Sequence, residues 1–360
     1  VLTQAVTEIT QKLPKRSAEG PGFLPLDRVF TKEGYGTVAT GTCLRGQIET
    51  GESVEVWGAD GSPLDSLKVR GLQALGSSKD LVGAGMRTAV NLSGRNAEHI
   101  KRGMVVATAG TFLAVDSCIA HLEALPHTRA LKSETLIAHL GTSEREATVI
   151  PLSGKTIEPG EQGGVLLRFD RPIACFAGQR LVLRRPGMHG CATVAGGEVL
   201  DPEPPRGKGS VSLCTSQLAN LQGTSRERLA ALARESRAAG ITRDAITRRI
   251  PPGEAGRAVE YLTKKGHLVR TSQNREHWVD AELISELIKR VTHMVNTHHD
   301  SAPLSDGLPE AEVSSKLPKP EQYLASVITE RAISAKKIAR HGTVLAIPGR
   351  GAAVDEASRK

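Results

Sequence analysis

The sequence of 360 residues has few aromatic side chains, no paired cysteines and no long apolar run. Aromatic residues make up 3% of the chain, so aliphatic side chains must build its cores. No segment approaches the roughly 18 apolar residues of a membrane span, and no basic-then-apolar leader opens the chain. We therefore expect a cytoplasmic protein of several domains, each with a modest core, that has no membrane partner.

The five cysteines lack any CxxC pair, which argues against a zinc knuckle, a redox motif or a disulfide framework. Buried reduced thiols are the favoured interpretation. The residues are Cys43, Cys118, Cys175, Cys191 and Cys214.

A complete nucleotide-binding motif is also missing. Gly154-Lys155-Thr156 is the only GK[ST] triplet, but Val149 stands where a P-loop needs its first glycine. No Asn-Lys-x-Asp signal for guanine is present. His298-His299-Asp300 offers potential metal ligands, yet adjacent residues at a helix end rarely converge on one ion. We expect no bound cofactor or metal in this chain and assign no catalytic residues.

Positive charge is concentrated in the C-terminal part of the chain. The formal net charge is +8, and from Arg206 onward 25 Lys and Arg face 17 Asp and Glu, which accounts for all of the excess. Such asymmetry fits a nucleic-acid partner, because neutralised phosphates release counterions and so favour binding. A solubilising surface explains the charge equally well.

The first half of the sequence alternates short runs of Val, Thr and Leu with glycine turns. In Ser53 to Trp57 apolar and polar residues alternate with period two, as in a half-buried strand. The pattern predicts two antiparallel β-barrels, over residues 21–110 and 111–203. The helical spacing of residues 1–13 predicts one amphipathic helix within a segment 1–20 that looks like the end of another domain.

Helical periodicity follows the stop Asp201-Pro202-Glu203-Pro204-Pro205. After a linker over 204–222, helices and a two-strand hairpin predict a winged helix over 223–280, and the plan repeats over 281–350. Residues 351–360 would begin a further element. The sequence thus predicts a multidomain β plus α protein with two β-barrels followed by tandem winged-helix domains.

Several motifs together resemble domain 2 of elongation factors. They are Pro25-Leu26-Asp27-Arg28-Val29-Phe30, Gly36-Thr37-Val38-Ala39-Thr40-Gly41, Ala84-Gly85-Met86-Arg87-Thr88-Ala89-Val90-Asn91-Leu92 and Arg102-Gly103-Met104-Val105. Tu-type factors have an acidic pair in the first motif, whereas Asp27-Arg28 is acid then base, which is similar to selenocysteine-specific elongation factors. Gly196-Gly197-Glu198-Val199 in the second barrel and the winged helices strengthen this resemblance, although Ala195 replaces a usual glycine.

The resemblance implies a fragment of a translation factor that binds selenocysteinyl-tRNA and delivers it to the ribosome at recoded UGA codons. The GTPase domain, with its GTP and Mg²⁺, and the last winged-helix units would lie outside this chain, so the chain itself would not be an enzyme. A selenocysteine-insertion hairpin in mRNA is a further implied partner, contacted mainly by the missing units, and we expect a monomer.

The resemblance also implies site residues. Asp27, Arg28 and Arg87 match the pocket for the aminoacyl end, where arginine would bind the selenolate and Asp27 the α-amino group. Because adjacent residues of a regular strand face opposite sides, Asp27 and Arg28 need a bulge or a strand end to share one pocket. Basic pairs are candidates for RNA phosphate contacts: Arg184, Arg185, Arg248, Arg249, Lys264, Lys265, Lys336 and Lys337.

Two other interpretations remain at this point. One is a fragment of a general Tu-like or initiation-type translation GTPase. The other is a winged-helix regulator with a β-barrel sensor, although the mixed charge of Pro251 to Lys265 suits major-groove recognition poorly.

Overall fold

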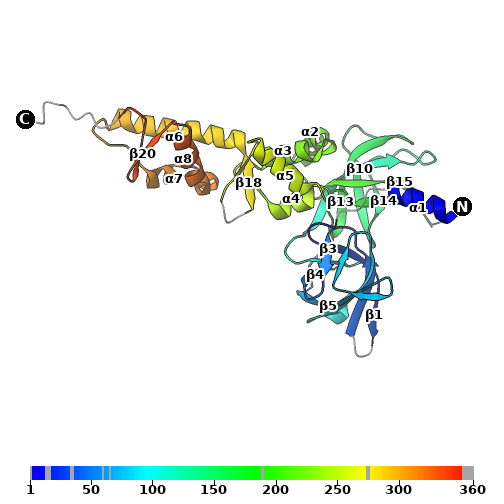
Figure 1. The fold of residues 1–360 in the computed structure, drawn as a ribbon. Helices are drawn as coiled ribbons and strands as arrows, with labels where there is room; N and C mark the ends of the chain where they lie inside the picture. The colour runs from blue at the N-terminus through cyan, green and yellow to red at the C-terminus, as the bar shows by residue number, and fades with distance from the viewer. Residues whose placement is uncertain are drawn as a thin grey trace, which may run out of the picture. The chain divides into compact units, whose positions relative to one another are not determined.

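The computed structural model describes residues 2–12, 18–32, 36–58, 61–64, 66–187, 190–272 and 276–350. Contacts divide the chain into two units: Val1–Ser225 with Asp244–Arg257, and Arg226–Arg243 with Ala258–Lys360. Figure 1 labels the helices and strands along the chain. The expected new element at 351–360 lies outside the described residues, as do Gly34 and Tyr35 next to the glycine motif.

The first predicted barrel is a closed antiparallel sheet. Six strands close in the order β4-β9-β1-β2-β8-β5, since β5 also pairs with β4, and β6 extends β5. Strands β3 and β7 form a separate pair, and a short helix η1 precedes β9. The bounds are β1 Phe23–Lys32, β2 Gly36–Thr42, β3 Gln47–Glu49, β4 Ser53–Trp57, β5 Leu67–Ala74, β6 Ser77–Lys79, β7 Leu81–Gly83, β8 Arg87–Ser93, η1 Ala97–His99 and β9 Val105–Thr108.

Close backbone approach explains one glycine of the barrel motif. A Cβ at Gly41 would lie 2.0 Å from the carbonyl oxygen of Pro25, in the neighbouring strand. In β2 burial alternates with period two, so that Thr37, Ala39 and Gly41 are buried while Val38, Thr40 and Thr42 are half-buried.

The second barrel is a closed sheet of six strands in the order β10-β13-β12-β11-β14-β15. Its core is aliphatic, with Leu122, Leu136, Val165 and Leu167 fully buried. A Cβ at Gly197 would lie 1.9 Å from the carbonyl oxygen of His121, so only glycine at this position lets β15 approach β10 this closely. The bounds are β10 Ala114–Ala124, β11 Glu134–Leu140, β12 Ser143–Pro151, β13 Gln162–Ala174, β14 Arg180–Gly187 and β15 Gly190–Asp201.

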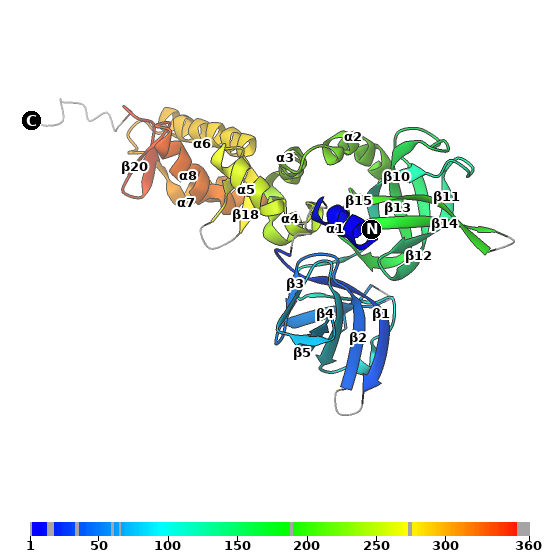
Figure 2. The ribbon, with the colours of Figure 1, turned by 45° about the vertical axis from the view of Figure 1, so that its right-hand side comes forward.

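A helix occupies most of the segment that we expected to be a linker. Helix α2, Ser210–Gln222, lies beside barrel 2 and buries Cys214, Leu218 and Leu221 (Figure 2). A Cβ at Gly164 would lie only 2.4 Å from the Leu218 side chain, so only a glycine at this position of β13 leaves room for the helix. Burial against the barrel therefore forms a helix from a segment rich in Ser, Thr and Asn.

The helical part of the chain has two repeats of short strand, helices and hairpin. In the first, β16-β18-β17 form a three-stranded sheet, and in the second, β19-β21-β20 do. The bounds are α3 Ser225–Ser236, η2 Arg237–Ala239, β16 Ile241–Thr242, α4 Arg243–Arg249, α5 Ala255–Lys264, β17 Leu268–Arg270, β18 His277–Asp280, α6 Ala281–Ser301, β19 Leu308–Pro309, α7 Glu310–Lys316, η3 Lys319–Leu324, α8 Ala325–Ser334, β20 Ala339–His341 and β21 Val344–Ala346.

The two repeats share one hydrophobic core within the second unit. Val279 of the first repeat and Leu345 of the second belong to the same buried cluster, which the long helix α6 joins through Leu287 and Val291. The carboxylate of Asp280 caps this helix by accepting a 2.8 Å hydrogen bond from the Glu282 amide. Repeats that share a core cannot move independently without exposing it.

The first helix, α1 Leu2–Lys12, exposes its apolar side chains Leu2, Val6 and Ile9. None of the described helices combines the length and the apolar character that a membrane span requires.

Candidate functional site

Strand β1 is irregular at the predicted aminoacyl-pocket residues. Leu26 pairs with Gly41 and Arg28 with Thr40, so Asp27 is the additional residue of a β-bulge. A bulge changes the direction in which side chains leave the strand. The structure thus has the local irregularity that Asp27 and Arg28 need to serve one site.

The bulge places Asp27 against strand β8. Arg87 donates two hydrogen bonds to the Asp27 carboxylate, the one from Nη2 to Oδ1 being 2.9 Å long, and Thr40 donates a third to Oδ1 at 3.0 Å. The hydrogen bond from Arg87, helped by that from Thr40, lowers the pKa of Asp27 below its usual value. The same bond raises the pKa of Arg87. Asp27 is therefore a carboxylate, and Arg87 a cation, throughout the neutral range.

Both partners remain accessible to a ligand. The side chain of Arg87 is 53% exposed and that of Asp27 is 28% exposed. Arg28 is exposed next to them and makes no hydrogen bond or ion pair with any residue that the structure describes. The bulge thus gathers one paired anion, one paired cation and one available cation. We call Asp27, Arg28 and Arg87 the aminoacyl cluster, after the role that the resemblance implies for them.

The arginines of barrel 2 are less available than we expected. Arg185 forms a bidentate ion pair with Glu134, with distances of 2.6 and 2.9 Å, and is largely buried. Burial by itself would raise the pKa of Glu134, but the bonds from Arg185 hold it below its usual value. Arg184 donates from Nη2 to the carbonyl oxygen of Cys191. This geometry argues against the phosphate contact predicted for Arg185.

Arg248 and Arg249 contradict the expectation of a phosphate-binding surface more directly. Arg248 is 8% exposed and bonds Glu203 at 2.6 Å and the carbonyl oxygen of Thr111 at 2.9 Å. Arg249 makes a bidentate pair with Asp201, which is fully buried. Spacing along the chain could not reveal these partners, which lie 45 to 137 residues earlier. The two side chains bind segment 244–257 to the end of barrel 2.

Arg45, a buried arginine that the sequence analysis did not single out, completes this junction. It lies between Phe112 and Phe176, with its Cζ 5.7 and 5.0 Å from the ring centroids, and donates to the carbonyl oxygen of Thr247 at 2.7 Å. Burial lowers its pKa to about 10, so the side chain still carries its charge at neutral pH. Three of the five phenylalanines, Phe23 included, pack edge to face here, and barrel 1 meets barrel 2 through them.

The remaining basic candidates lie on the surface. Lys264, Lys265, Lys336 and Lys337 are all exposed, and no ion pair joins them to the described residues. Their geometry is compatible with a phosphate contact.

The histidines considered as metal ligands have separate partners. His298 bonds the Ser305 hydroxyl, His299 accepts from the Ile347 amide, and Asp300 pairs with Arg350. The GK[ST] triplet lies in the loop between β12 and β13 and precedes no helix.

Two family models match successive parts of the chain. The elongation factor Tu domain 2 family matches residues 36–107, which include β2 and β8 of the first barrel. The β-barrel domain family of selenocysteine-specific elongation factors matches residues 118–206. The first match covers the Arg87 side of the aminoacyl cluster, and the second covers nearly all of barrel 2.

Whole-chain similarity agrees with the domain matches. A selenocysteine-specific elongation factor from Desulfomicrobium baculatum is 29% identical over 337 residues, which are 91% of this chain and 51% of that protein. The crystal structure of a bacterial selenocysteine-specific elongation factor aligns with a TM-score of 0.65 at 19% identity, over 96% of this chain and 53% of the other. The chain therefore spans about half the length of these proteins.

The order of the matched domains and the whole-chain identity point to the same proteins. The chain is similar to the selenocysteine-specific elongation factors, with a match to the Tu domain 2 family that is followed by a match to the β-barrel domain family of those factors.

Proposed function

We propose that this chain is part of a factor that binds selenocysteinyl-tRNA, in a GTP-dependent manner in the intact protein, and delivers it to the ribosome at recoded UGA codons. The observation that carries the proposal is the aminoacyl cluster at the β1 bulge, in a chain whose second barrel is of the selenocysteine-specific type. Barrel 1 would hold the aminoacyl end of the tRNA.

The charges of the ligand match those of the cluster. A selenol is more acidic than a thiol and is largely ionised at neutral pH, and the esterified amino acid also carries an α-ammonium group. The ammonium group would bind Asp27, and the selenolate would bind Arg87 and Arg28. The ligand would thus replace each partner of the Asp27–Arg87 pair with a group of the same charge.

Exposure makes this exchange feasible. An accessible ion pair contributes about 0 to 1 kcal/mol, so opening the Asp27–Arg87 pair requires little free energy. Serine offers the same ammonium group but only a neutral hydroxyl, so it would gain nothing from the two guanidinium groups. The cluster would therefore distinguish selenocysteine from serine by the charge of the side chain. It would bind the α-ammonium group of both.

The test is to replace Arg28 or Arg87 with Ala in the intact factor bound to GTP. Loss of a charge-assisted hydrogen bond should weaken selenocysteinyl-tRNA binding by roughly 10- to 100-fold and seryl-tRNA binding much less. Arg70→Ala, an exposed arginine on β5 outside the cluster, is the matched control. Equal losses for the two tRNAs would refute a role in selenolate recognition.

We also infer that the two helical repeats are winged helices that contact RNA. Each has a three-stranded sheet with a hairpin, and Lys264, Lys265, Lys336 and Lys337 are exposed. Phosphate contacts release counterions, so RNA affinity of the chain should fall steeply as salt increases. An affinity that stays flat from low to moderate salt would exclude them.

The alternative of a general Tu-like or initiation-type factor has less support, because the selenocysteine-specific barrel family matches residues 118–206. No observation favours a transcription regulator.

A further inference from the structure

The first helical repeat exposes an aromatic side chain on helix α5. Tyr261 is one of three tyrosines in a chain that is poor in aromatic residues, and it is 38% exposed. Ala258 and Leu262 are the buried positions of this helix. The Tyr261 ring therefore lies outside the packed side of α5.

A guanidinium group lies over this ring. The Cζ atom of Arg226, at the start of helix α3, is 3.9 Å from the ring centroid, so the two flat groups are in contact (Figure 1). Arg226 is exposed, and neither its guanidinium nor the Tyr261 hydroxyl has a hydrogen bond or ion pair with any residue that the structure describes. The guanidinium thus keeps its five N–H donors for a ligand.

The second repeat shows that the fold does not require an aromatic residue at this position. Helices α5 and α8 end in the same pattern of three backbone hydrogen bonds. From amide to carbonyl, they are Lys265–Tyr261, Gly266–Thr263 and His267–Leu262 in the first repeat, and Ala335–Arg331, Lys336–Ile333 and Lys337–Ala332 in the second. The equivalent of Tyr261 is therefore Arg331, which is also exposed. The tyrosine is a property of the first repeat and not of the shared architecture.

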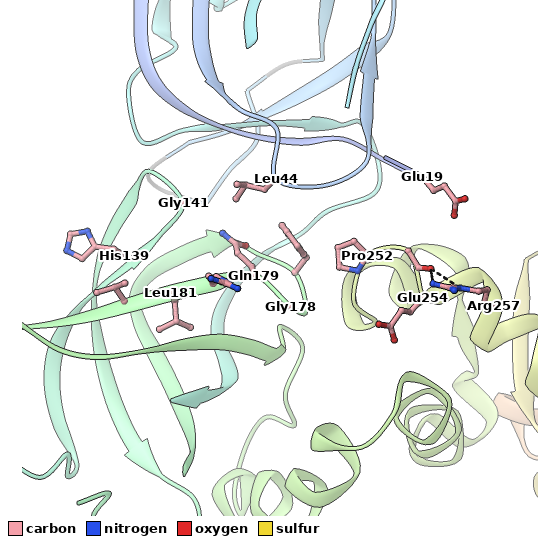
Figure 3. A pocket seen from close by; sticks show the side chains of 14 residues that line it. Glu19, Leu44, His139, Gly141, Gly178, Gln179, Leu181, Pro252, Glu254 and Arg257 are labelled. Carbon is pink, nitrogen blue, oxygen red and sulfur yellow. Dashed lines mark hydrogen bonds between the residues drawn. The ribbon is translucent and has the colours of Figure 1, made fainter. Parts of the chain in front are cut away.

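Positive charge lies next to the ring. Lys264 and Lys265 follow Tyr261 by three and four residues, on the same side of the helix, and are exposed without an ion pair to the described residues. Arg257, one turn before Tyr261, is already occupied, because it donates from Nε and Nη2 to the carbonyl oxygen of Gly253 (Figure 3). The cations available beside the ring are therefore the two lysines and the stacked arginine.

Acidic side chains do not cancel this charge. Glu227, next to Arg226, has a partner of its own. Glu260 is exposed, but it lies about 100° around the helix from Tyr261. The surface is thus a stack of a ring and a guanidinium in which three cations outnumber one acidic neighbour.

We propose that Tyr261 and Arg226 form a stacking platform for an unpaired base of RNA, and that Lys264 and Lys265 bind the phosphates beside that base. Unstacked bases bind to tyrosine rings and to guanidinium planes, and lysines contact phosphates whatever the sequence. A base inside a duplex has no free face, so the platform selects single-stranded RNA. The proposal rests on the RNA contact proposed above for the helical repeats, and it names the kind of RNA that the first repeat binds.

The experiment measures binding of the 360-residue chain to three short fluorescein-labelled RNAs of equal length by fluorescence anisotropy. One is an unstructured single strand, one is the same strand annealed to its complement, and one is a strand of abasic ribose units that keeps the phosphates. We expect the single strand to bind roughly fivefold or more tightly than the other two. Absence of saturable single-strand binding, or an affinity no higher than that of the abasic strand, overturns the proposal.

Variants at one position test the stacking. Tyr261→Leu should weaken single-strand binding by roughly 5- to 150-fold and leave abasic-strand binding unchanged, because only the ring is lost. Tyr261→Phe keeps the ring and should restore the affinity. Because the side chain is exposed and its hydroxyl has no partner among the described residues, both variants should melt like the parent chain. Arg331→Leu is the matched control in the second repeat, and the ratio of the two affinities should not change.

Replacing both lysines separates the platform from the phosphate contact. Lys264→Ala combined with Lys265→Ala should weaken single-strand and abasic-strand binding by the same factor, because both strands carry phosphates. A loss confined to this double variant supports the phosphate contact and overturns the platform. A loss confined to Tyr261→Leu supports the platform and shows that the two lysines do not contact phosphates.

Discussion

Two bidentate arginine–aspartate pairs in the first unit differ sharply in their surroundings. In the barrel junction, the Arg249 side chain is 14% exposed and Asp201 is fully buried. In the aminoacyl cluster, Arg87 is 53% exposed and Asp27 is 28% exposed. The same chemistry therefore fixes structure in one place and stays accessible to a ligand in the other. Burial, rather than the residue types, decides which role an ion pair has.

The junction pair should show the largest effect. Asp201→Ala leaves the Arg249 guanidinium buried without its carboxylate, so we expect a loss of roughly 3 to 5 kcal/mol in the free energy of unfolding. Urea unfolding followed by circular dichroism measures it. The matched control is Asp27→Ala, for which we expect less than about 1 kcal/mol. Similar losses at the two sites would contradict the comparison.

Arg45 should have the next largest effect. Arg45→Met keeps an unbranched side chain between Phe112 and Phe176 but removes the bond to Thr247, for which we expect a loss of roughly 1.5 to 3 kcal/mol. Hydrogen exchange should also become faster in segment 244–257, where that carbonyl oxygen lies. An unchanged exchange pattern would show that Arg45 does not hold this segment.

The pH dependence of Asp27 sharpens the comparison further. Its folded-state pKa lies below the unfolded value, so the unfolded state binds the proton more readily and stability rises with pH through this range. The contribution is fully present above the unfolded pKa of about 3.9 and is lost as the pH falls through the lower folded value. The free energies of unfolding of the parent chain and of Asp27→Asn should therefore become equal at acidic pH. A difference that persists there would mean that the charge is not what matters.

The smallest effects on stability should come from the lysines. Replacing Lys264 and Lys265, or Lys336 and Lys337, with Ala should change the free energy of unfolding by less than about 0.5 kcal/mol. If these residues contact phosphates, replacing either pair should reduce the slope of log affinity for RNA against log salt concentration by roughly 2. A slope equal to that of the parent chain would show that the replaced pair does not contact phosphates.

Local patterns predicted the two barrels because strand alternation and glycine turns are encoded within a few residues. The burial pattern of β4 follows its alternating sequence, and Gly41 and Gly197 stand where strands approach closely. Helix α2 escaped prediction because its sequence is poor in strong helix formers and its stability comes from burying Cys214, Leu218 and Leu221. A signal that the sequence did offer was Gly164 inside a strand, where the missing side chain leaves room for Leu218 of the packed helix.

In the candidate site, too, some features could be predicted from the sequence and others appeared only in the folded chain. Asp27, Arg28 and Arg87 could be selected from motifs, and the requirement for a bulge followed from strand geometry, but the pairing of Asp27 with Arg87 joins residues 60 positions apart. Arg248 and Arg249 looked like any exposed basic pair, since a helix segment gives no sign of the carboxylates that it will meet.

The sequence by itself determined the repeating elements and the order of two barrels before a helical part, and it supplied the prediction that Asp27, Arg28 and Arg87 form one site. Tertiary structure alone decided which charges are buried and which remain free, and it placed segment 244–257 with the barrels. The physical reason is range: strand period and turn chemistry act between neighbouring residues, whereas desolvation and ion pairing depend on groups that only folding brings together.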